Sequence, residues 1–452
     1  MTSPTSLDAA AIRAEGNHKG PARTHRSQGI RRTRRWMLPA LIAVAYVLLQ
    51  IVGKPALLPS NDAYFYARAT LEILGDSRKE AAAEAKKALC GDQARRDVRL
   101  TERNPLALAK KGGRPHGERQ AQCVAQLPNK SFAPPSPRYQ QIFETRPGYP
   151  VLAAPFVAAL GVNAGLVATS VLFTALGGLL AYLLLRATGA PARIALAGQA
   201  LYYLCPLGWW GGYPITEGPA LAATTGVLLG AWWLLQRRAA AGTIMLAGSM
   251  ILGTAVKYST FLVIGGALAA AALICLLWIA GTRHRGTVLL LTLSLACAAG
   301  VAALSAHYQL PGSADTLQDT FTGHFARRDV ADPWGLLVEL NTNFWVQWLQ
   351  EQARAPWLFV ALGLGLWGLF RRGAALGWTV LAVASTGVAA VAAHPVASES
   401  DRLMVSVWLV VVLGLPLLLR QMTTHRDQTN APVLIEPMPT DPAAPVLAGP
   451  AH

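Results

Sequence analysis

The sequence is poor in charge, in cysteine and in clusters of residues that bind metals. Only 14% of its 452 residues are charged, whereas 53% are hydrophobic, and the mean hydropathy is +0.33. Soluble globular chains carry about 25% charged residues, so this composition excludes that class and indicates a membrane protein. The five cysteines form no Cys-x-x-Cys pair and the nine histidines no pair at i, i+4. Zinc fingers, dense disulfide scaffolds and helical metal sites are therefore excluded.

Basic residues outnumber acidic residues by 40 to 24, which gives a formal net charge of +16. Such an excess indicates nucleic-acid binding when it covers one soluble face. Here the basic residues lie mostly in the terminal segments and in the connections between apolar runs. We therefore expect no nucleic-acid partner. The chain also lacks an internal repeat at a fixed period, which excludes a repeat array.

Long apolar runs fill the sequence between residues 36 and 420. Ten of them have spanning or near-spanning length, at 36–52, 164–185, 194–210, 217–235, 243–256, 259–280, 287–304, 356–370, 374–393 and 403–420. They predict an all-α polytopic membrane protein with about ten transmembrane helices in one domain, 36–420. The first run follows a cluster of arginines and precedes no small-residue cleavage site, so we expect a retained helix rather than a signal peptide.

Charge in the connections predicts the orientation in the plasma membrane. The connections that this count places inside carry arginine, and the short outer ones contain little Lys or Arg, as the positive-inside rule requires. The inner arginines are Arg186, Arg193, Arg237, Arg238, Arg283, Arg285, Arg371, Arg372, Arg420 and Arg426. The long connection 75–147 is also basic, but loops longer than about 60 residues are largely exempt, so we expect it outside. Both termini are then cytoplasmic, and 1–35 and 421–452 are predicted to be disordered tails.

A second outer segment, 305–355, contains an amphipathic helix pattern. Asp332 and Pro333 are typical of an N-cap and a first helical turn. Apolar residues then recur at three- and four-residue spacing on one side of the predicted helix, namely Trp334, Leu337, Val338, Phe344, Trp345, Trp348 and Leu349. Two interpretations stay open: a helix lying in the outer membrane interface with tryptophan at headgroup depth, or a stripe packed on the protein's own core.

Cys90 and Cys123 are the only cysteines outside the apolar runs. Both lie in the long connection that we place in an oxidising compartment. A disulfide between them would close a loop of about 34 residues and contribute roughly 3–4 kcal/mol in the chain-entropy model. Two free thiols are the alternative.

Asp62 is the first candidate site residue, because it follows the first predicted span directly in Asn61-Asp62-Ala63-Tyr64-Phe65-Tyr66. Its carboxylate has two interpretations. It caps the following helix by accepting backbone N–H bonds, which the local pattern favours, or it accepts a proton at the membrane surface.

Further polar groups are predicted at the same side of the membrane. Glu144 to Pro150 contain Arg146 and Tyr149, and Glu217 starts the run at 217–235. Lys257 separates two runs, and Glu399 and Arg402 precede the last one. A lysine at the centre of a span costs about 2.5–3.5 kcal/mol on insertion scales, so Lys257 needs a partner or a function unless it snorkels to the headgroups. Glu217 and Glu399, taken singly, are typical of surface-loop carboxylates.

The order of these features resembles the membrane glycosyltransferases of the GT-C superfamily. The resemblance rests on an acidic residue after the first span, on Arg146-Pro147-Gly148-Tyr149-Pro150, on Tyr213-Pro-x-x-Glu217 and on Gly253 to Tyr258 before a long apolar helix. It implies a polytopic enzyme that takes a sugar from a polyprenyl-phosphate donor at the outer face with inversion, and the role of base falls on Asp62. Many members have two adjacent acids where this chain has Asn61-Asp62, which leaves the acceptor class and a divalent cation open.

The resemblance also implies the partners. These are a polyprenyl-phosphate sugar, a glycan, lipid or protein acceptor of the cell envelope, and membrane lipids. Arg146, Lys257 and Arg402 are candidates to hold the phosphate, while Tyr149, Glu217 and Glu399 complete the predicted substrate-binding set. The alternative function is a polytopic transporter or lipid flippase, although transporters usually place ionisable groups near the membrane midplane and contain a repeated half.

Overall fold

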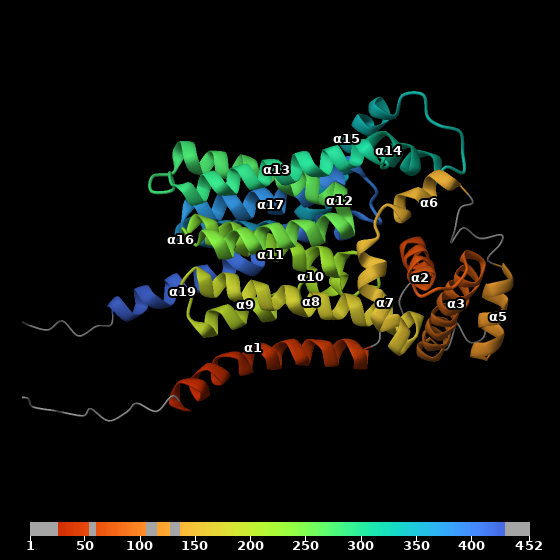
Figure 1. Ribbon diagram of the computed structural model, residues 1–452, viewed down its shortest axis with the longest axis horizontal. Helices are drawn as coiled ribbons and strands as arrows, with labels where there is room; N and C mark the ends of the chain where they lie inside the picture. Colours follow the sequence, from red (N-terminus) through yellow and green to blue (C-terminus); the bar gives the residue numbers. More distant parts are fainter. Residues whose placement is uncertain (1–25, 54–59, 105–114, 127–135, 430–452) are drawn as a thin grey trace, which may run out of the picture.

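The computed structural model describes residues 26–53, 60–104, 115–126 and 136–429, and within these ranges every regular element is a helix. The prediction of an all-α chain is confirmed for these residues. The long helices run side by side, whereas α2 (Asn61–Ile73), α3 (Arg78–Arg103), α5 (His116–Gln126) and α6 (Pro137–Glu144) gather beyond one end of the bundle (Figure 1).

Seven helices of the described chain are long and apolar enough to cross a membrane, or eight if the bent pair α15–α16 counts as one span. They identify a multi-pass membrane protein. These segments are Trp36–Gly53 of α1, α8 (Val162–Ala187), α11 (Glu217–Leu235), α12 (Ala239–Trp278), α13 (Arg285–His307), α17 (Ala374–Ala393) and Ser400–Gln421, which includes α18 (Ser400–Leu403), η2 (Met404–Val407) and the start of α19 (Trp408–Thr429).

The predicted run 194–210 is not one continuous helix. It is divided into α9 (Ala192–Leu204) and α10 (Pro206–Gly211) by an extended residue, Cys205. Pro206 explains the break, because proline has no N–H and disfavours helical backbone at the residue before it.

The 40-residue element α12 contains two predicted runs, and it reverses direction between them. Lys257 has non-helical backbone angles, φ −156° and ψ 68°. Gly253 and Phe261 are eight residues apart, which is about 12 Å along a straight helix. In the structure they are in contact, because a Cβ placed on Gly253 would overlap the ring of Phe261. The runs 243–256 and 259–280 are therefore antiparallel arms that meet at Lys257.

The ends of the chain are more helical than predicted. The first helix, α1, begins at Arg26 and the last one ends at Thr429, so residues 26–35 and 421–429 of the two predicted disordered tails, 1–35 and 421–452, are helical. Arginine and glutamine are good helix formers and extend a helix that the membrane span has already nucleated. The remaining parts of both predicted tails lie outside the described residues.

The described parts of the long connection, 75–104, 115–126 and 136–147, form a helical lobe. Its helix α3 starts with a capping box, in which Ser77 and Glu80 satisfy each other's backbone N–H groups. An aromatic core joins the lobe to α7 (Gly148–Leu160), and it includes Phe65, Tyr66, Tyr139, Phe143 and Tyr149.

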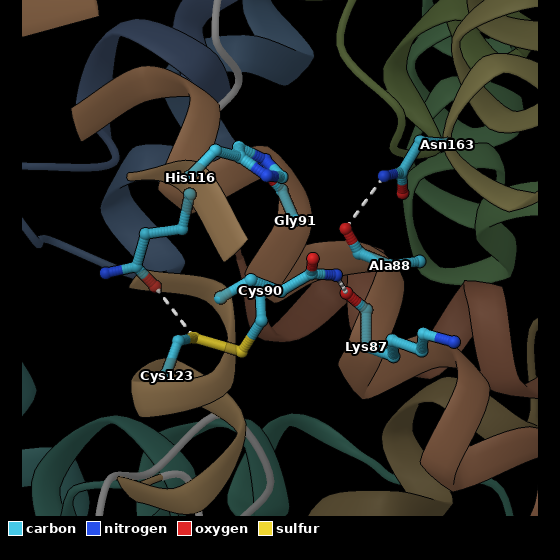
Figure 2. The surroundings of a disulfide bond; sticks show 9 residues. Lys87, Ala88, Cys90, Gly91, His116, Cys123 and Asn163 are labelled. Carbon is cyan, nitrogen blue, oxygen red and sulfur yellow. Dashed lines mark hydrogen bonds between the residues drawn. A yellow bond between two sulfur atoms is a disulfide. The ribbon is translucent and has the colours of Figure 1, made fainter. Parts of the chain in front are cut away.

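A disulfide joins Cys90 of α3 to Cys123 of α5, so of the two alternatives the structure has the bridge rather than two free thiols (Figure 2). The helix α5 buries none of its side chains, so few other contacts hold it. Gln120 Nε2 donates to the Lys87 carbonyl at 3.0 Å, and His116 Nε2 lies 3.0 Å from the Gly91 carbonyl.

The helix predicted after Asp332 is α15 (Pro333–Arg354), and the Asp332 side chain accepts the Gly335 N–H, which confirms the N-cap. It makes an angle of 89° with α16 (Trp357–Arg372). One part of its apolar stripe packs on the protein's own core, where Phe344, Trp345 and Trp348 contact Val391, Met404 and Val407. Another part stays exposed, including Trp334, Val338 and Leu349. The core-packing interpretation therefore describes part of this helix, and the placement of its exposed part in the outer membrane interface stays a prediction.

Replacing Cys90 and Cys123 together with alanine should release α5 from α3 and leave the spans unchanged, because the bridge contributes roughly 3–4 kcal/mol and α5 has no buried side chain to replace it. Hydrogen exchange of 116–126 in the solubilised protein should rise at least about tenfold, with α8 unaffected. Cys297→Ala is the control. Unchanged protection of α5 would contradict this account.

Candidate functional site

Asp62 does not cap its helix. The N-cap of α2 is Ser60, whose hydroxyl accepts the Ala63 N–H at 3.1 Å. Asp62 lies in the first turn, and its Oδ2 instead accepts from Arg402 Nη1 at 2.9 Å, across 340 residues of sequence. The capping interpretation was therefore wrong, and the carboxylate belongs to a tertiary cluster.

Arg402, on α18, is the centre of this cluster. Its guanidinium also lies 3.0 Å from Glu399 Oε2 and 3.6 Å from Glu217 Oε1. Only 19% of the Arg402 side chain is exposed. A planar guanidinium presents five donors in a fixed fork, which suits a residue that contacts three carboxylates at once.

Glu217 links this arginine to the second cation of the cluster. Lys257 Nζ donates to Glu217 Oε1 at 3.2 Å, and only 4% of the Glu217 side chain is exposed. The prediction that Lys257 needs a partner is confirmed, and the surface-loop interpretation of Glu217 is wrong. Glu399 is more exposed, and partial burial raises its pKa while the nearby Arg402 opposes the rise.

Arg146, which precedes α7, differs from the other two cations. Its Nε is buried and has no hydrogen-bond partner among the described residues, and no ion pair joins it to a carboxylate there. The hydroxyl of Tyr66 is its immediate electrostatic neighbour, and Asp62 acts on it as well. Arg146 is therefore a cation of the site whose charge is not neutralised by a paired acid.

Tyr66 is a site residue that the sequence reasoning missed. It is completely buried, and its hydroxyl interacts with the guanidinium of Arg146. Burial raises the pKa of Tyr66 to about 12, so the hydroxyl keeps its proton at neutral pH and is available as a donor. The signal was its spacing, because residues i and i+4 of a helix, here Asp62 and Tyr66, share one face.

Gly148 brings Arg146 toward the charged cluster. A Cβ on Gly148 would lie 2.6 Å from the backbone carbon of Ala255, so only glycine permits this close approach to the α12 arm that leads to Lys257. Tyr149, the next residue, is fully buried and uses its hydroxyl internally, at 3.0 Å from the Leu166 carbonyl and 2.9 Å from the Ser170 hydroxyl. Tyr149 thus joins α7 to α8, and the structure gives it packing contacts instead of a free polar group.

The cluster does not resemble a metal centre. Within the described ranges no group of three or more His, Cys, Asp or Glu side chains is arranged to hold a metal ion. Asp62, Glu217 and Glu399 instead converge on a guanidinium. Their negative charge is balanced by Arg402 and by Lys257.

The arrangement combines a carboxylate that can accept a proton with cations that can hold an anion. Comparison with protein-family models, curated proteins and solved structures gave no match to this chain.

Glu217→Gln should destabilise the protein strongly, because it leaves Lys257 and Arg402 with less negative charge in a buried position. Removing one partner of a buried ion pair typically costs about 3–5 kcal/mol. Thermal unfolding of the purified protein in detergent measures the effect, with Glu339→Gln on the exposed surface of α15 as the matched control. Equal unfolding midpoints for the two variants would show that the pair contributes little.

Proposed function

We propose that the protein is an inverting membrane glycosyltransferase that moves a sugar from a polyprenyl-phosphate donor to a cell-envelope acceptor at the outer face of the plasma membrane. One observation carries the proposal: Asp62 and three cations, from segments that are far apart in the sequence, gather where helices of the bundle begin. The similarity of the sequence motifs to the GT-C superfamily supports it.

The proposed reaction needs only one carboxylate. The acceptor hydroxyl oxygen attacks the anomeric carbon, the bond from that carbon to the phosphate oxygen breaks, and the hydroxyl proton passes to Asp62. The lipid phosphate leaves as a stabilised anion and needs no general acid. Asp62 lies at the start of a helix with 23% of its side chain exposed, which supports access of the acceptor to it in this proposal.

The donor phosphate requires a cation, and Arg146 is the strongest of the three candidates. Lys257 is paired with Glu217, and Arg402 is shared by three carboxylates. A buried charge is costly unless an opposite charge accompanies it, so an unpaired Arg146 favours binding of an anion. The Tyr66 hydroxyl beside it would add a neutral donor to the same phosphate.

The different residues at the two ends of the bundle support the proposed orientation. The charged cluster lies where α2, α11 and α18 begin, whereas the short arginine-bearing connections lie at the opposite ends of the spans. His284 Nε2, for example, lies 3.1 Å from the Leu235 carbonyl and so places the start of α13 beside the end of α11. We infer ten spans with the arginine end and both termini in the cytoplasm. Ionisable groups gathered at one end favour an enzyme over a transporter or flippase.

Lys79→Cys should be labelled from outside intact cells by a membrane-impermeant maleimide, whereas Arg371→Cys should react only after permeabilisation. Both positions are exposed, and they lie at opposite ends of the spans. The unsubstituted protein is the control, because it measures any labelling of the three cysteines outside the disulfide. Two of these, Cys205 and Cys275, are buried. Labelling in the reverse order would place the candidate site in the cytoplasm and remove the proposed donor and acceptor.

Asp62→Asn should slow sugar transfer from a polyprenyl-phosphate donor at least about a hundredfold, because general-base catalysis contributes about a hundred- to ten-thousandfold. Asparagine keeps the size of the side chain, Ser60 still caps the helix, and Arg402 retains Glu217 and Glu399 as partners, so the variant should fold normally. Initial rates on purified protein test this, and near wild-type transfer would place the base elsewhere.

Arg146→Gln and Lys257→Met make a matched pair that separates the roles of the cations. The first removes the charge that has no paired acid, so it should mainly raise the apparent KM for the lipid donor. The second leaves Glu217 close to Arg402 and should act more on stability than on the KM. A normal donor KM in Arg146→Gln would transfer the phosphate-binding role to Arg402 or Lys257.

A further inference from the structure

A second ionisable pair lies next to the candidate site, between α14 (Ser313–Thr322) and the segment that follows it. His324 Nδ1 is 3.0 Å from Asp319 Oδ1, and both Asp62 and Glu399 act electrostatically on this imidazole. The His324 side chain is 43% exposed, so it is held at the surface of the site rather than in the core.

The backbone of this segment is strained. Gly323, His324 and Phe325 have φ angles of 62°, 64° and 58°, three consecutive residues in the left-handed region. Such angles are uncommon for non-glycine residues and a genuine outlier for a bulky aromatic one, and they persist only where the surroundings enforce them. Strained backbone of this kind concentrates at functional sites.

Several contacts enforce this conformation. The Phe325 N–H donates to the Thr322 hydroxyl at 2.9 Å, and Gln318 closes the segment with two hydrogen bonds of 2.8 Å to the backbone of Val330. Arg138, on α6, binds both Asp315 and Asp329 and stacks on the Phe325 ring. The segment is therefore fastened to α6 as well as to itself.

The enforced conformation presses His324 against the residue that holds the start of α2. The His324 and Tyr139 rings have centroids 4.4 Å apart. Asn61 Nδ2 donates to the Tyr139 hydroxyl at 3.0 Å, and Asn61 directly precedes Asp62. A continuous series of contacts thus runs from Asp319 through His324, Tyr139 and Asn61 to the proposed catalytic base.

We propose that His324, fixed by Asp319, is a positioning residue that sets the orientation of Asp62 through Tyr139 and Asn61. The inference rests on the proposed function of Asp62. A general base must lie within hydrogen-bond distance of the acceptor hydroxyl, and small misplacements of a reacting group cost large factors in rate. His324 itself contacts neither substrate in this proposal.

This role makes transfer depend on pH in a defined direction. The groups that act on His324 are Asp319 on α14, Asp62 on α2 and Glu399 before α18, with His394 at the end of α17 close by. The hydrogen bond to Asp319 raises the pKa of His324, the nearby carboxylates add to the rise, and partial burial opposes it. Because the pKa of His324 is raised in the folded protein, the imidazole is fully protonated and the ion pair complete at pH values below the ordinary histidine pKa. The ion pair is lost as the pH rises through the raised pKa of the folded protein. The positioning effect should weaken on that alkaline side.

Two variants test the proposal by steady-state kinetics on the purified full-length protein. Asparagine tolerates left-handed backbone, so His324→Asn removes the ring and the charge at little conformational cost. It should lower kcat about ten- to a hundredfold with an unchanged KM for the lipid donor. Asp319→Asn leaves the imidazole in place. It should move the alkaline limb of the pH profile of kcat to lower pH. His307→Asn, at an exposed histidine, should change neither.

The same variants distinguish a missing positioning role of His324 from a wrong assignment of the catalytic base. If Asp62→Asn abolishes transfer but His324→Asn keeps the wild-type kcat, His324 does not position the base. An alkaline limb that Asp319→Asn leaves in place also overturns the proposal, and this holds even if His324→Asn does not fold. If Asp62→Asn is fully active, the proposed function fails first, and the positioning role fails with it.

Discussion

The guanidinium of Arg402 is the contact on which the geometry of the charged cluster depends. It binds Asp62, Glu399 and Glu217, and through Glu217 it is connected to Lys257. These residues come from the starts of three helices and from the turn of α12. Burying so many charges at the end of a membrane-spanning bundle is tolerable only because each carboxylate has a cation within reach. Loss of one partner would leave others uncompensated.

The membrane spans provide the rigid frame for this cluster. α12 reverses at Lys257, which presents the ammonium group at the turn between two antiparallel arms. Gly148 lets the chain after Arg146 approach the same arm within backbone contact. The helical lobe beyond the bundle then holds Asp62 from the other side, through the aromatic core of α2, α6 and α7. The site is a junction of lobe and bundle rather than a product of one motif.

The predicted and observed elements agree where one physical signal dominates. Apolar runs and the Asp332 cap were predicted from the sequence, because span length and capping chemistry each act locally, whereas the disulfide was one of two alternatives that the sequence left open. The capping role of Asp62 was predicted wrongly for the same reason. A short polar side chain near the start of a helix is typical of a cap, but Ser60 is the cap here and Asp62 pairs with Arg402 across 340 residues.

The sequence by itself determined that the chain is a membrane protein of apolar helices, and it supplied the candidate residues, because hydropathy and residue chemistry are properties of short segments. Only the tertiary structure decided how those residues pair. In it, Lys257 pairs with Glu217, and Arg402 contacts three carboxylates. Arg146 has no paired carboxylate, and the ring of His324 contacts that of Tyr139. Such pairings depend on which helix ends meet, and this is set by packing between segments that are distant in the chain.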